Sequence, residues 1–308
     1  MISVVIPLYN KQESIVATLQ SVLAQTYQNF EIVVVDDGST DNSARVVEEL
    51  FEKHPILQGG DRGRLIKKNN GGVSSARNEG IRLAKFNYVA FLDADDYWEP
   101  TYLETQVKMI QDFPDAKMWG TAWGTMIGTK KYEGHGVRIA EDFRGVIDST
   151  TYFSNKMYLY WTSIVIVDKR IFEHIEMFDE LLSCGEDVDL WWRIILHNPV
   201  AYTNQCLAYY RQDTENRITL SKPKLQKHFI NYIEKYEEYY EKSPEFKQYL
   251  QYEVLGHLYK YFIQDPQDEN IKRILKQIDF SLQPFSYRLR YLMPKVYEML
   301  LKLKRKSK

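Results

Sequence analysis

The sequence is poor in several features that would each define a class of protein. Its 308 residues include only two cysteines, Cys184 and Cys206, too few for a disulfide framework and typical of a reducing compartment. No apolar run approaches the roughly 20 residues of a membrane-spanning helix. The first apolar stretch follows no basic segment, so residues 1–6 are expected to form a strand rather than a signal peptide. These features predict a cytoplasmic protein.

Excess charge and several common site signatures are also missing. The 40 Lys and Arg residues nearly balance 42 Asp and Glu, for a net charge of −2, which argues against nucleic-acid binding. The six histidines have no HxxxH-like spacing, so the sequence gives no zinc site. Neither GxGxxG after a strand nor GxxxxGK[ST] occurs, which removes the usual dinucleotide and P-loop interpretations.

What the sequence does contain is an alternation of buried strands and amphipathic helices. Strands are predicted over residues 3–8, 31–35, 64–67 and 88–92, each followed by a helical pattern. We read Asn10 and Glu13 as a capping box for the first of these helices. Such alternation predicts an α/β fold with a parallel sheet. Further strands are predicted over 161–168, 200–202 and 207–211.

After Pro223 the pattern becomes helical, with helices predicted over 224–242, 245–263, 270–279 and 286–305. We therefore expect an α/β domain over residues 1–220 and a helical region over 221–308. In the last 22 residues Lys and Arg alternate with Leu, Met and Tyr. That pattern is typical of peripheral contact with an anionic membrane surface, and equally of a solvated helix end.

Three predicted strand ends carry residues suited to a nucleoside diphosphate. Carboxyl ends of parallel strands meet at one edge of a sheet, where ligands bind. Asp93 and Asp95 are two residues apart and, on extended backbone, would face one Mg²⁺ or Mn²⁺ bridging phosphates. Tyr9 could lie against a base, and Asp37 could accept the imide N–H of uracil. Taken singly, each is also explained as a core, turn or helix-capping residue.

Four blocks at these positions together resemble glycosyltransferase family 2, and the resemblance covers residues 1–215. They are SVVIPLYN (3–10), VDDGSTD (35–41), NGGVSSARNEG (70–80) and FLDADD (91–96). The resemblance implies a GT-A fold and an inverting transferase that takes a nucleotide-sugar, usually a UDP-sugar, with Mn²⁺ or Mg²⁺. A transferase of bacterial surface-polysaccharide assembly follows by analogy, with a saccharide or lipid-linked saccharide as acceptor.

The resemblance also implies roles for individual residues. It makes Asp93-Ala94-Asp95 the DxD motif, with Asp95 the direct metal ligand aided by Asp93. It implies further donor contacts by Pro7, Tyr9, Glu13, Asp37 and Arg77.

A second acidic pair, Glu186 and Asp187, follows the acceptor-side strands at the start of a predicted helix. Inversion in one displacement needs a base on the acceptor hydroxyl, and Asp187 matches the family's base position. Helix capping is the structural alternative, and a helix N-terminus is expected to lower a carboxyl pKa. Trp192 and Arg193 match an aromatic-Arg pair that faces the acceptor in the family.

One position departs from the family pattern. Many members have a histidine near the diphosphate where this chain has Asp213, and Arg217 could serve there instead. Two alternatives to a glycosyltransferase stay open on the sequence alone. They are a sugar-1-phosphate nucleotidyltransferase and a non-catalytic glycan-binding protein on the same fold.

Overall fold

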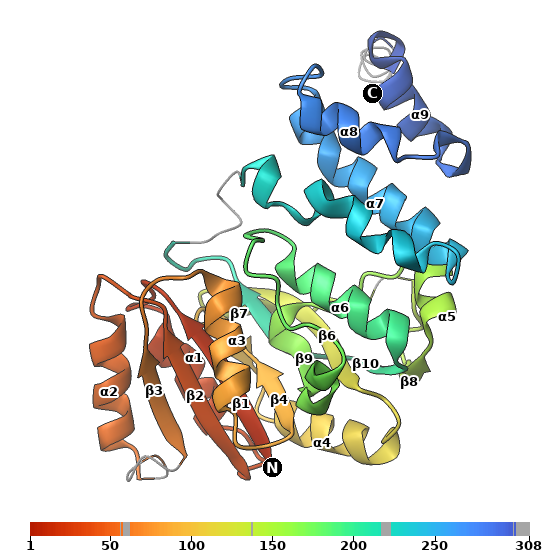
Figure 1. Ribbon diagram of the computed structural model, residues 1–308. Coiled ribbons are helices and arrows are strands. Elements are labelled where there is room, and N and C mark those ends of the chain that lie inside the picture. The colour runs from red at the N-terminus through yellow and green to blue at the C-terminus, as the bar shows by residue number, and fades with distance from the viewer. Residues whose placement is uncertain (56, 58–61, 137, 217–222, 298, 300–308) are drawn as a thin grey trace. The chain divides into compact units, whose positions relative to one another are not determined.

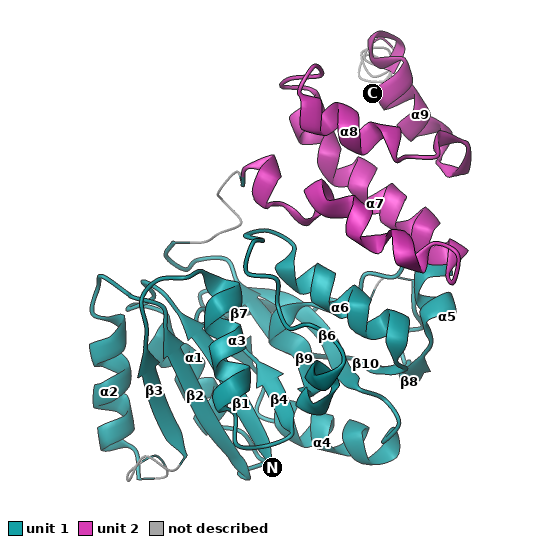
Figure 2. Ribbon diagram, viewed as in Figure 1, with its two compact units in different colours: residues 1–223 teal, residues 224–308 magenta. Residues whose placement is uncertain are grey.

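The computed structural model describes residues 1–55, 57, 62–136, 138–216, 223–297 and 299. The chain divides into two compact units, Met1–Pro223 and Lys224–Lys308 (Figure 2). The predicted boundary after residue 220 falls in the stretch 217–222, outside the described residues. Within the described ranges, no helix is both long enough and apolar enough to cross a bilayer.

The first unit is a mixed sheet with helices around it (Figure 1), which confirms the predicted α/β class. Its strand order is β3-β2-β1-β4-β9-β6-β10-β5, with β7 paired to β6 and β8 to β10. The strands are β1 (Ile2–Leu8), β2 (Phe30–Asp36), β3 (Gly63–Lys67), β4 (Tyr88–Phe91), β5 (Tyr97–Trp98), β6 (Met118–Ile127), β7 (Lys130–Tyr132), β8 (Arg144–Ile147), β9 (Val165–Asp168) and β10 (Val200–Arg211).

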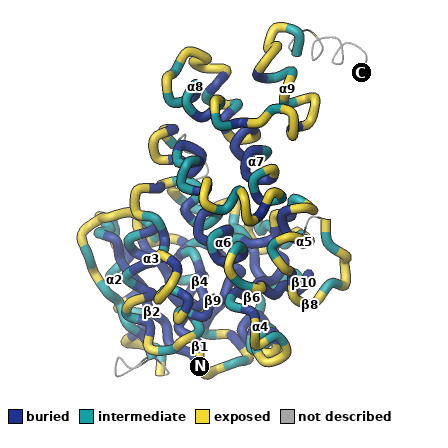
Figure 3. Tube along the Cα trace, turned by 45° about the vertical axis from the view of Figure 1, so that its right-hand side comes forward, coloured by how far each residue is buried: buried dark blue, intermediate teal, exposed yellow. Residues whose placement is uncertain are grey.

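Strands β1 to β4 form the parallel half that the sequence predicts. β1 lies between β2 and β4 and pairs in parallel with both, and β2 pairs in parallel with β3. All residues of β1 and β2 are buried, and the central strands are dark blue in Figure 3. These strands are near-continuous apolar runs because both faces of a parallel sheet are covered.

The other half of the sheet contains both parallel and antiparallel strand pairs. β9 runs antiparallel to both β4 and β6, while β6 and β10 are parallel. The start of β9 therefore lies at the same edge as the carboxyl ends of β4, β6 and β10. The two strands predicted over 200–202 and 207–211 are one strand, β10, with register shifts on both sides of Cys206.

Helix α3 (Val73–Leu83) contacts β1 and β2 and lies in front of them in Figure 1. Its close approach depends on Gly80, because a Cβ there would lie 2.2 Å from Cγ1 of Val5. The other α-helices of this unit are α1 (Ile15–Leu23), α2 (Ser43–Lys53), α4 (Tyr102–Asp112), α5 (Ser149–Ser154) and α6 (Glu186–His197), with the 3₁₀ turns η1 (Thr162–Ile164) and η2 (Lys169–Glu173).

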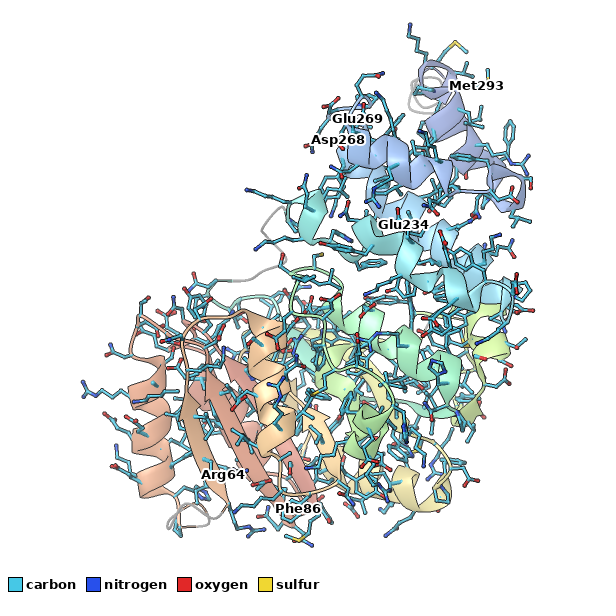
Figure 4. All side chains as sticks on the ribbon, viewed as in Figure 1. Arg64, Phe86, Glu234, Asp268, Glu269 and Met293 are labelled. Carbon is cyan, nitrogen blue, oxygen red and sulfur yellow. The ribbon has the colours of Figure 1, made fainter. Side chains whose placement is uncertain are left out.

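The second unit is helical, as the sequence predicts. It contains η4 (Leu225–Lys227), η5 (Phe229–Tyr239), α7 (Pro244–Phe262), α8 (Glu269–Lys276), η6 (Phe280–Leu282) and α9 (Phe285–Leu292). Ser243 caps α7 by accepting from the Phe246 N–H, and Asp268, labelled in Figure 4, caps α8. The helix predicted over 224–242 is instead 3₁₀, with a non-helical residue at Tyr232.

The helix predicted over 286–305 is interrupted, because helical backbone covers residues 285–292 and resumes over 294–297. α9 ends at Leu292, and Met293, labelled in Figure 4, leaves helical geometry at φ −139°. The next residue is Pro294, which disfavours helical backbone in the residue before it. The basic stretch 300–308, which carries much of the predicted membrane-binding pattern, lies outside the described residues.

Candidate functional site

At the carboxyl edge of the parallel strands, Asp37 organises the loop that precedes α3. Its backbone N–H donates to the Leu8 carbonyl at 2.8 Å, which joins the ends of β1 and β2. Its carboxylate accepts from Lys68 Nζ at 2.8 Å and from the N–H groups of Gly71 and Gly72 at 2.9 and 2.7 Å. Asp37 thus fixes the backbone of residues 68–72 at the site. Its predicted contact with uracil stays a prediction.

The DxD segment differs from the extended geometry that we expected. β4 ends at Phe91, and the Asp96 N–H donates to the Asp93 carbonyl at 3.1 Å, which closes a turn. Asp93 and Asp95 therefore have different partners. Asp93 pairs with Arg77 at 2.7 Å and Asp95 with Lys11 at 2.6 Å. The two carboxylates therefore do not follow the alternation of an extended strand, because β4 ends before Asp93.

Arg77, buried in α3, connects the two acidic motifs. Its Nη2 donates to Asp93 at 2.7 Å and its Nη1 to Glu186 at 2.9 Å, although the two acids are far apart in the chain. Its guanidinium also lies over the Phe178 ring, 5.3 Å from the centroid. Burial opposes its charge, but the two carboxylates raise the pKa of Arg77. Its predicted approach to the donor stays a prediction.

The second acidic pair opens α6, after Gly185 in left-handed backbone at φ 77°. Glu186 is held by Arg77, whereas Asp187 accepts from the Thr162 hydroxyl at 3.1 Å and the Val188 N–H at 2.8 Å. Desolvation and the neighbouring Glu186 carboxylate raise the pKa of Asp187 to about 6. The expectation that the helix N-terminus would lower this pKa was wrong, because burial and like charge outweigh it.

Two consecutive residues of η1, Thr162 and Ser163, join the parts of the site. Thr162 holds Asp187, while Ser163 Oγ accepts from the Asp93 N–H at 3.0 Å and donates to Asp96 at 2.6 Å. Burial, with the Asp95 and Asp93 carboxylates nearby, raises the pKa of Asp96. Sequence reasoning missed Thr162 and Ser163, since nothing in a hydroxyl pair at the start of a strand singles it out.

The segment after β10 closes over the loop after β1. Lys11 Nζ donates to Asp95 at 2.6 Å and to the Glu215 carbonyl at 2.6 Å, and the Thr214 hydroxyl donates to Asp95 at 3.1 Å. The Glu215 carboxylate accepts from the Ser14 N–H at 3.2 Å and from its hydroxyl at 3.0 Å. Residues 214–216 are thereby tied to the DxD turn and to the start of α1.

These contacts correct the predicted capping box. α1 begins at Ile15, and Asn10 has left-handed backbone with φ 52°. The Asn10 side chain accepts from the Thr40 N–H at 2.8 Å, so it joins the β1 and β2 loops. The Glu13 N–H instead donates to the distant Glu215 carboxylate at 3.0 Å.

The remaining predicted donor residues lie in different surroundings. Tyr9 is 47% exposed at the end of β1, available to stack on a base. Pro7 is buried in β1 opposite Val35, and Ala94 is also buried, while the Glu13 side chain is exposed. Asp213 accepts from the Gly128 N–H at 2.7 Å and so holds the β6–β7 turn. Arg217 lies outside the described residues.

The acceptor roles of Trp192 and Arg193 stay predictions. Trp192 is only 2% exposed and so presents little of its ring to solvent. Arg193 pairs with Asp189 at 2.9 Å and donates to the backbone carbonyls of Glu176 and Met177. It therefore holds the loop before α6.

The donor set at this edge suits a cation that is completed by phosphate and water. Among the described residues, no group of three or more His, Cys, Asp or Glu side chains is placed to hold a metal ion. Asp95 already faces one cation, the Lys11 ammonium, and Asp93 is engaged by Arg77. A single carboxylate fits Mg²⁺, which usually keeps waters and takes one or two carboxylates beside substrate phosphates.

Fold and site together define an α/β enzyme with acids gathered at the carboxyl edge of a parallel sheet. The model of Glycosyl transferase family 2 matches residues 3–176, more than half of the chain. The chain therefore belongs to glycosyl transferase family 2 and is a glycosyltransferase. This membership decides against the nucleotidyltransferase.

Two curated relatives are bacterial glycosyltransferases. Glycosyltransferase GlyA of Streptococcus pneumoniae serotype 4 is 34% identical over 225 residues, 68% of this chain and 30% of GlyA. The UDP-Glc:alpha-D-GlcNAc-diphosphoundecaprenol beta-1,3-glucosyltransferase WfaP of Escherichia coli is 37% identical over 112 residues, 36% of this chain and 41% of WfaP. The matched segment covers less than half the length of either relative.

A solved structure shares the fold. Staphylococcus aureus TarS, residues 1–349, in complex with UDP-GlcNAc, superposes with a TM-score of 0.70 over 91% of this chain and 82% of that one. The sequence identity is 17%, so this likeness concerns the fold alone. It agrees with the GT-A architecture expected from the sequence.

Proposed function

We propose that this enzyme moves a sugar, with inversion, from a UDP-sugar to a hydroxyl of a saccharide or lipid-linked saccharide in surface-polysaccharide assembly. The observation that carries the proposal is the pairing of Arg77 with both Asp93 and Glu186, at 2.7 and 2.9 Å. It brings a diphosphate-side motif and a base-side motif into one site. The choice of donor is supported by WfaP, which is named for UDP-Glc, and by TarS, whose structure was solved in complex with UDP-GlcNAc.

On the donor side, we assign the base to the region of Tyr9 and Asp37 and the diphosphate to Asp95. A divalent cation, Mn²⁺ or Mg²⁺, would be held by Asp95 and would neutralise charge on the departing diphosphate. Lys11 already lies 2.6 Å from Asp95, so a positive charge at this point is compatible with the site. Asp93, engaged by Arg77, positions the turn that presents Asp95.

On the acceptor side, we assign Asp187 as the general base. It accepts the proton of the acceptor hydroxyl while that oxygen attacks the anomeric carbon and the bond to the diphosphate oxygen breaks, releasing UDP. A pKa near 6 suits this role, because the carboxylate is ionised at neutral pH yet basic enough to take a proton. Glu186 is a positioning residue, since its carboxylate is bound by Arg77.

The test is a panel of UDP-, GDP- and dTDP-sugars, assayed for hydrolysis and transfer with Mn²⁺, with Mg²⁺ and with EDTA. We expect turnover of a UDP-sugar that depends on metal, and loss of metal-dependent UDP binding in Asp95→Ala. If EDTA does not reduce turnover, the proposed dependence on a metal ion is wrong. Preference for GDP- or dTDP-sugars would overturn the assigned donor.

A further inference from the structure

Three aromatic side chains meet at the carboxyl edge, on segments whose neighbouring residues contact Asp187 and the DxD turn. Trp123 comes from β6, Trp161 directly precedes η1, and Tyr210 is near the end of β10. The Trp123 and Trp161 ring centroids are 5.1 Å apart, and those of Trp161 and Tyr210 are 5.9 Å apart. We call this group the aromatic platform.

The exposure of the platform separates it from the aromatic clusters of the core. Trp123, Trp161 and Tyr210 are each partly exposed. By contrast, the neighbouring cluster of Phe91, Phe178 and Trp191 is at most 3% exposed. Exposing rings that could bury large apolar areas costs stability, so such a group at a site edge points to a ligand.

The chain neighbours of the platform connect it to both halves of the reaction. Trp161 is followed by Thr162, whose hydroxyl holds Asp187 at 3.1 Å, and by Ser163, which holds the DxD turn. Tyr210 is followed by Arg211, whose carbonyl lies 3.5 Å from the Thr214 hydroxyl that also contacts Asp95. A ligand on the platform therefore lies beside the base and within reach of the donor end.

We propose that the aromatic platform is the acceptor subsite and that it stacks a pyranose ring of the acceptor saccharide. A pyranose presents C–H groups of slight positive charge, and these suit the negative face of an aromatic ring. Stacking leaves the hydroxyls at the rim of the ring free, so one of them can approach Asp187. This inference rests on the proposed function and replaces Trp192, which the structure buries.

The experiment compares wild type with Trp161→Ala, Trp161→Phe and a control, Tyr27→Ala. Tyr27 is also partly buried, but it precedes β2 at the opposite edge of the sheet. The probes are methyl glycosides of glucose, galactose, mannose, N-acetylglucosamine and N-acetylgalactosamine. Their binding to protein saturated with UDP is measured by saturation-transfer NMR, and UDP binding by calorimetry.

We expect at least one glycoside to bind wild type, with affinity about tenfold weaker in Trp161→Ala. Trp161→Phe, which keeps a ring, should bind nearly as wild type, and Tyr27→Ala should be unchanged. UDP affinity should be the same in all four proteins. These results would place the acceptor, and not the donor, on Trp161.

Two outcomes overturn the platform. One is a wild type that hydrolyses UDP-sugar yet binds none of the glycosides, and the other is glycoside binding that Trp161→Ala leaves intact. A wild type that neither binds UDP nor hydrolyses its sugars would instead overturn the proposed function. In that case Trp161-dependent glycoside binding would still support a saccharide site.

Discussion

The two ends of the parallel sheet each bury acids beside an arginine, but they balance charge differently. At the amino end, Glu31 accepts from the Ser3 hydroxyl and the Lys85 N–H, both at 2.6 Å, and from Arg64 at 2.8 Å. Figure 4 labels Arg64 and Phe86 at this end, and the Phe86 N–H donates to the same Ser3 hydroxyl. One carboxylate is thus fully surrounded by donors.

At the carboxyl end, acids outnumber the basic side chains that contact them. Within the described ranges, Arg77 and Lys11 are the basic side chains paired with these acids, which are Asp93, Asp95, Asp96, Glu186 and Asp187. Burial, followed by the neighbouring carboxylates, raises the pKa values of Asp96 and Asp187. The amino end stabilises the fold. The carboxyl end has an excess of negative charge, which a metal ion and a proton can neutralise.

The largest expected effect is on catalysis at the carboxyl end. Asp187→Asn should lower the rate of sugar transfer by about 10²–10⁴-fold, the usual contribution of a general base, and leave UDP binding unchanged. Transfer assays and calorimetry measure the two quantities. In wild type the rate should rise with pH up to about 6 and then level off, because the base must be ionised.

Asp187 should also make the stability of the protein depend on pH, and here stability falls as pH rises whereas the rate increases. Because the folded-state pKa of Asp187 is raised from 3.8 to about 6, its contribution to stability is fully present below pH 3.8 and lost as pH rises through 6. Asp187→Asn should remove this part of the pH dependence. Urea denaturation at several pH values measures it, and a variant whose stability follows the wild-type curve would contradict the raised pKa.

The next effect concerns the amino end. Glu31→Gln should lower the free energy of unfolding by about 3 kcal/mol, because it breaks a buried ion pair and leaves Arg64 without its partner. The activity per folded molecule should be unchanged. Urea denaturation and active-site titration with UDP provide the measurement. A selective loss of activity would mean that the two ends are not independent.

Removing the connecting arginine should change the pH profile. Arg77 lowers the pKa of Asp187, so Arg77→Met should shift the acidic limb of the rate profile above pH 6. The variant also leaves Asp93 and Glu186 unpaired, so we expect lower stability. Arg82→Met, which removes an exposed pair on the same helix, is the control. An unshifted limb in a folded Arg77→Met would show that Asp187 is not the titrating group.

The smallest effect concerns the lysine at the DxD turn. Lys11→Ala removes the ammonium that pairs with Asp95, so Mn²⁺ should bind the protein–UDP complex a few-fold more tightly. Calorimetry with Mn²⁺ measures this without turnover. Lys108→Ala, which breaks an exposed helical pair with Glu104, should have no effect. Weaker Mn²⁺ binding in Lys11→Ala would mean that Lys11 supports the cation rather than competing with it.

The sequence predicted much of the frame of this site but few of its supporting contacts. The strand-end acids Asp37 and Asp95 could be singled out because strand periodicity indicated where each strand ends, and the family resemblance pointed to Asp187 at the start of a helix. The parallel half of the sheet followed from the same periodicity. The antiparallel insertion of β9 did not, since strand order depends on long-range pairing that no local pattern encodes.

Contacts made by residues outside any recognisable motif could not be predicted from the sequence. Thr162 and Ser163 are unremarkable in the sequence, yet the antiparallel direction of β9 brings them to the acids. A residue pattern does not tell which of two adjacent tryptophans on a helix is buried, and here both Trp191 and Trp192 are. The Asp187 pKa depends on burial, which appears only once α6 is packed.

The contact of Glu215 with Ser14 also bears on the order in which parts of the first unit fold. It joins residues 201 positions apart, so closing it carries a large entropic cost and is expected late in folding. On a ribosome, the start of α1 would emerge early and wait for nearly the whole unit to be synthesised before gaining its cap. A truncated chain ending before residue 214 would form the early strands and still lack the closure at their edge.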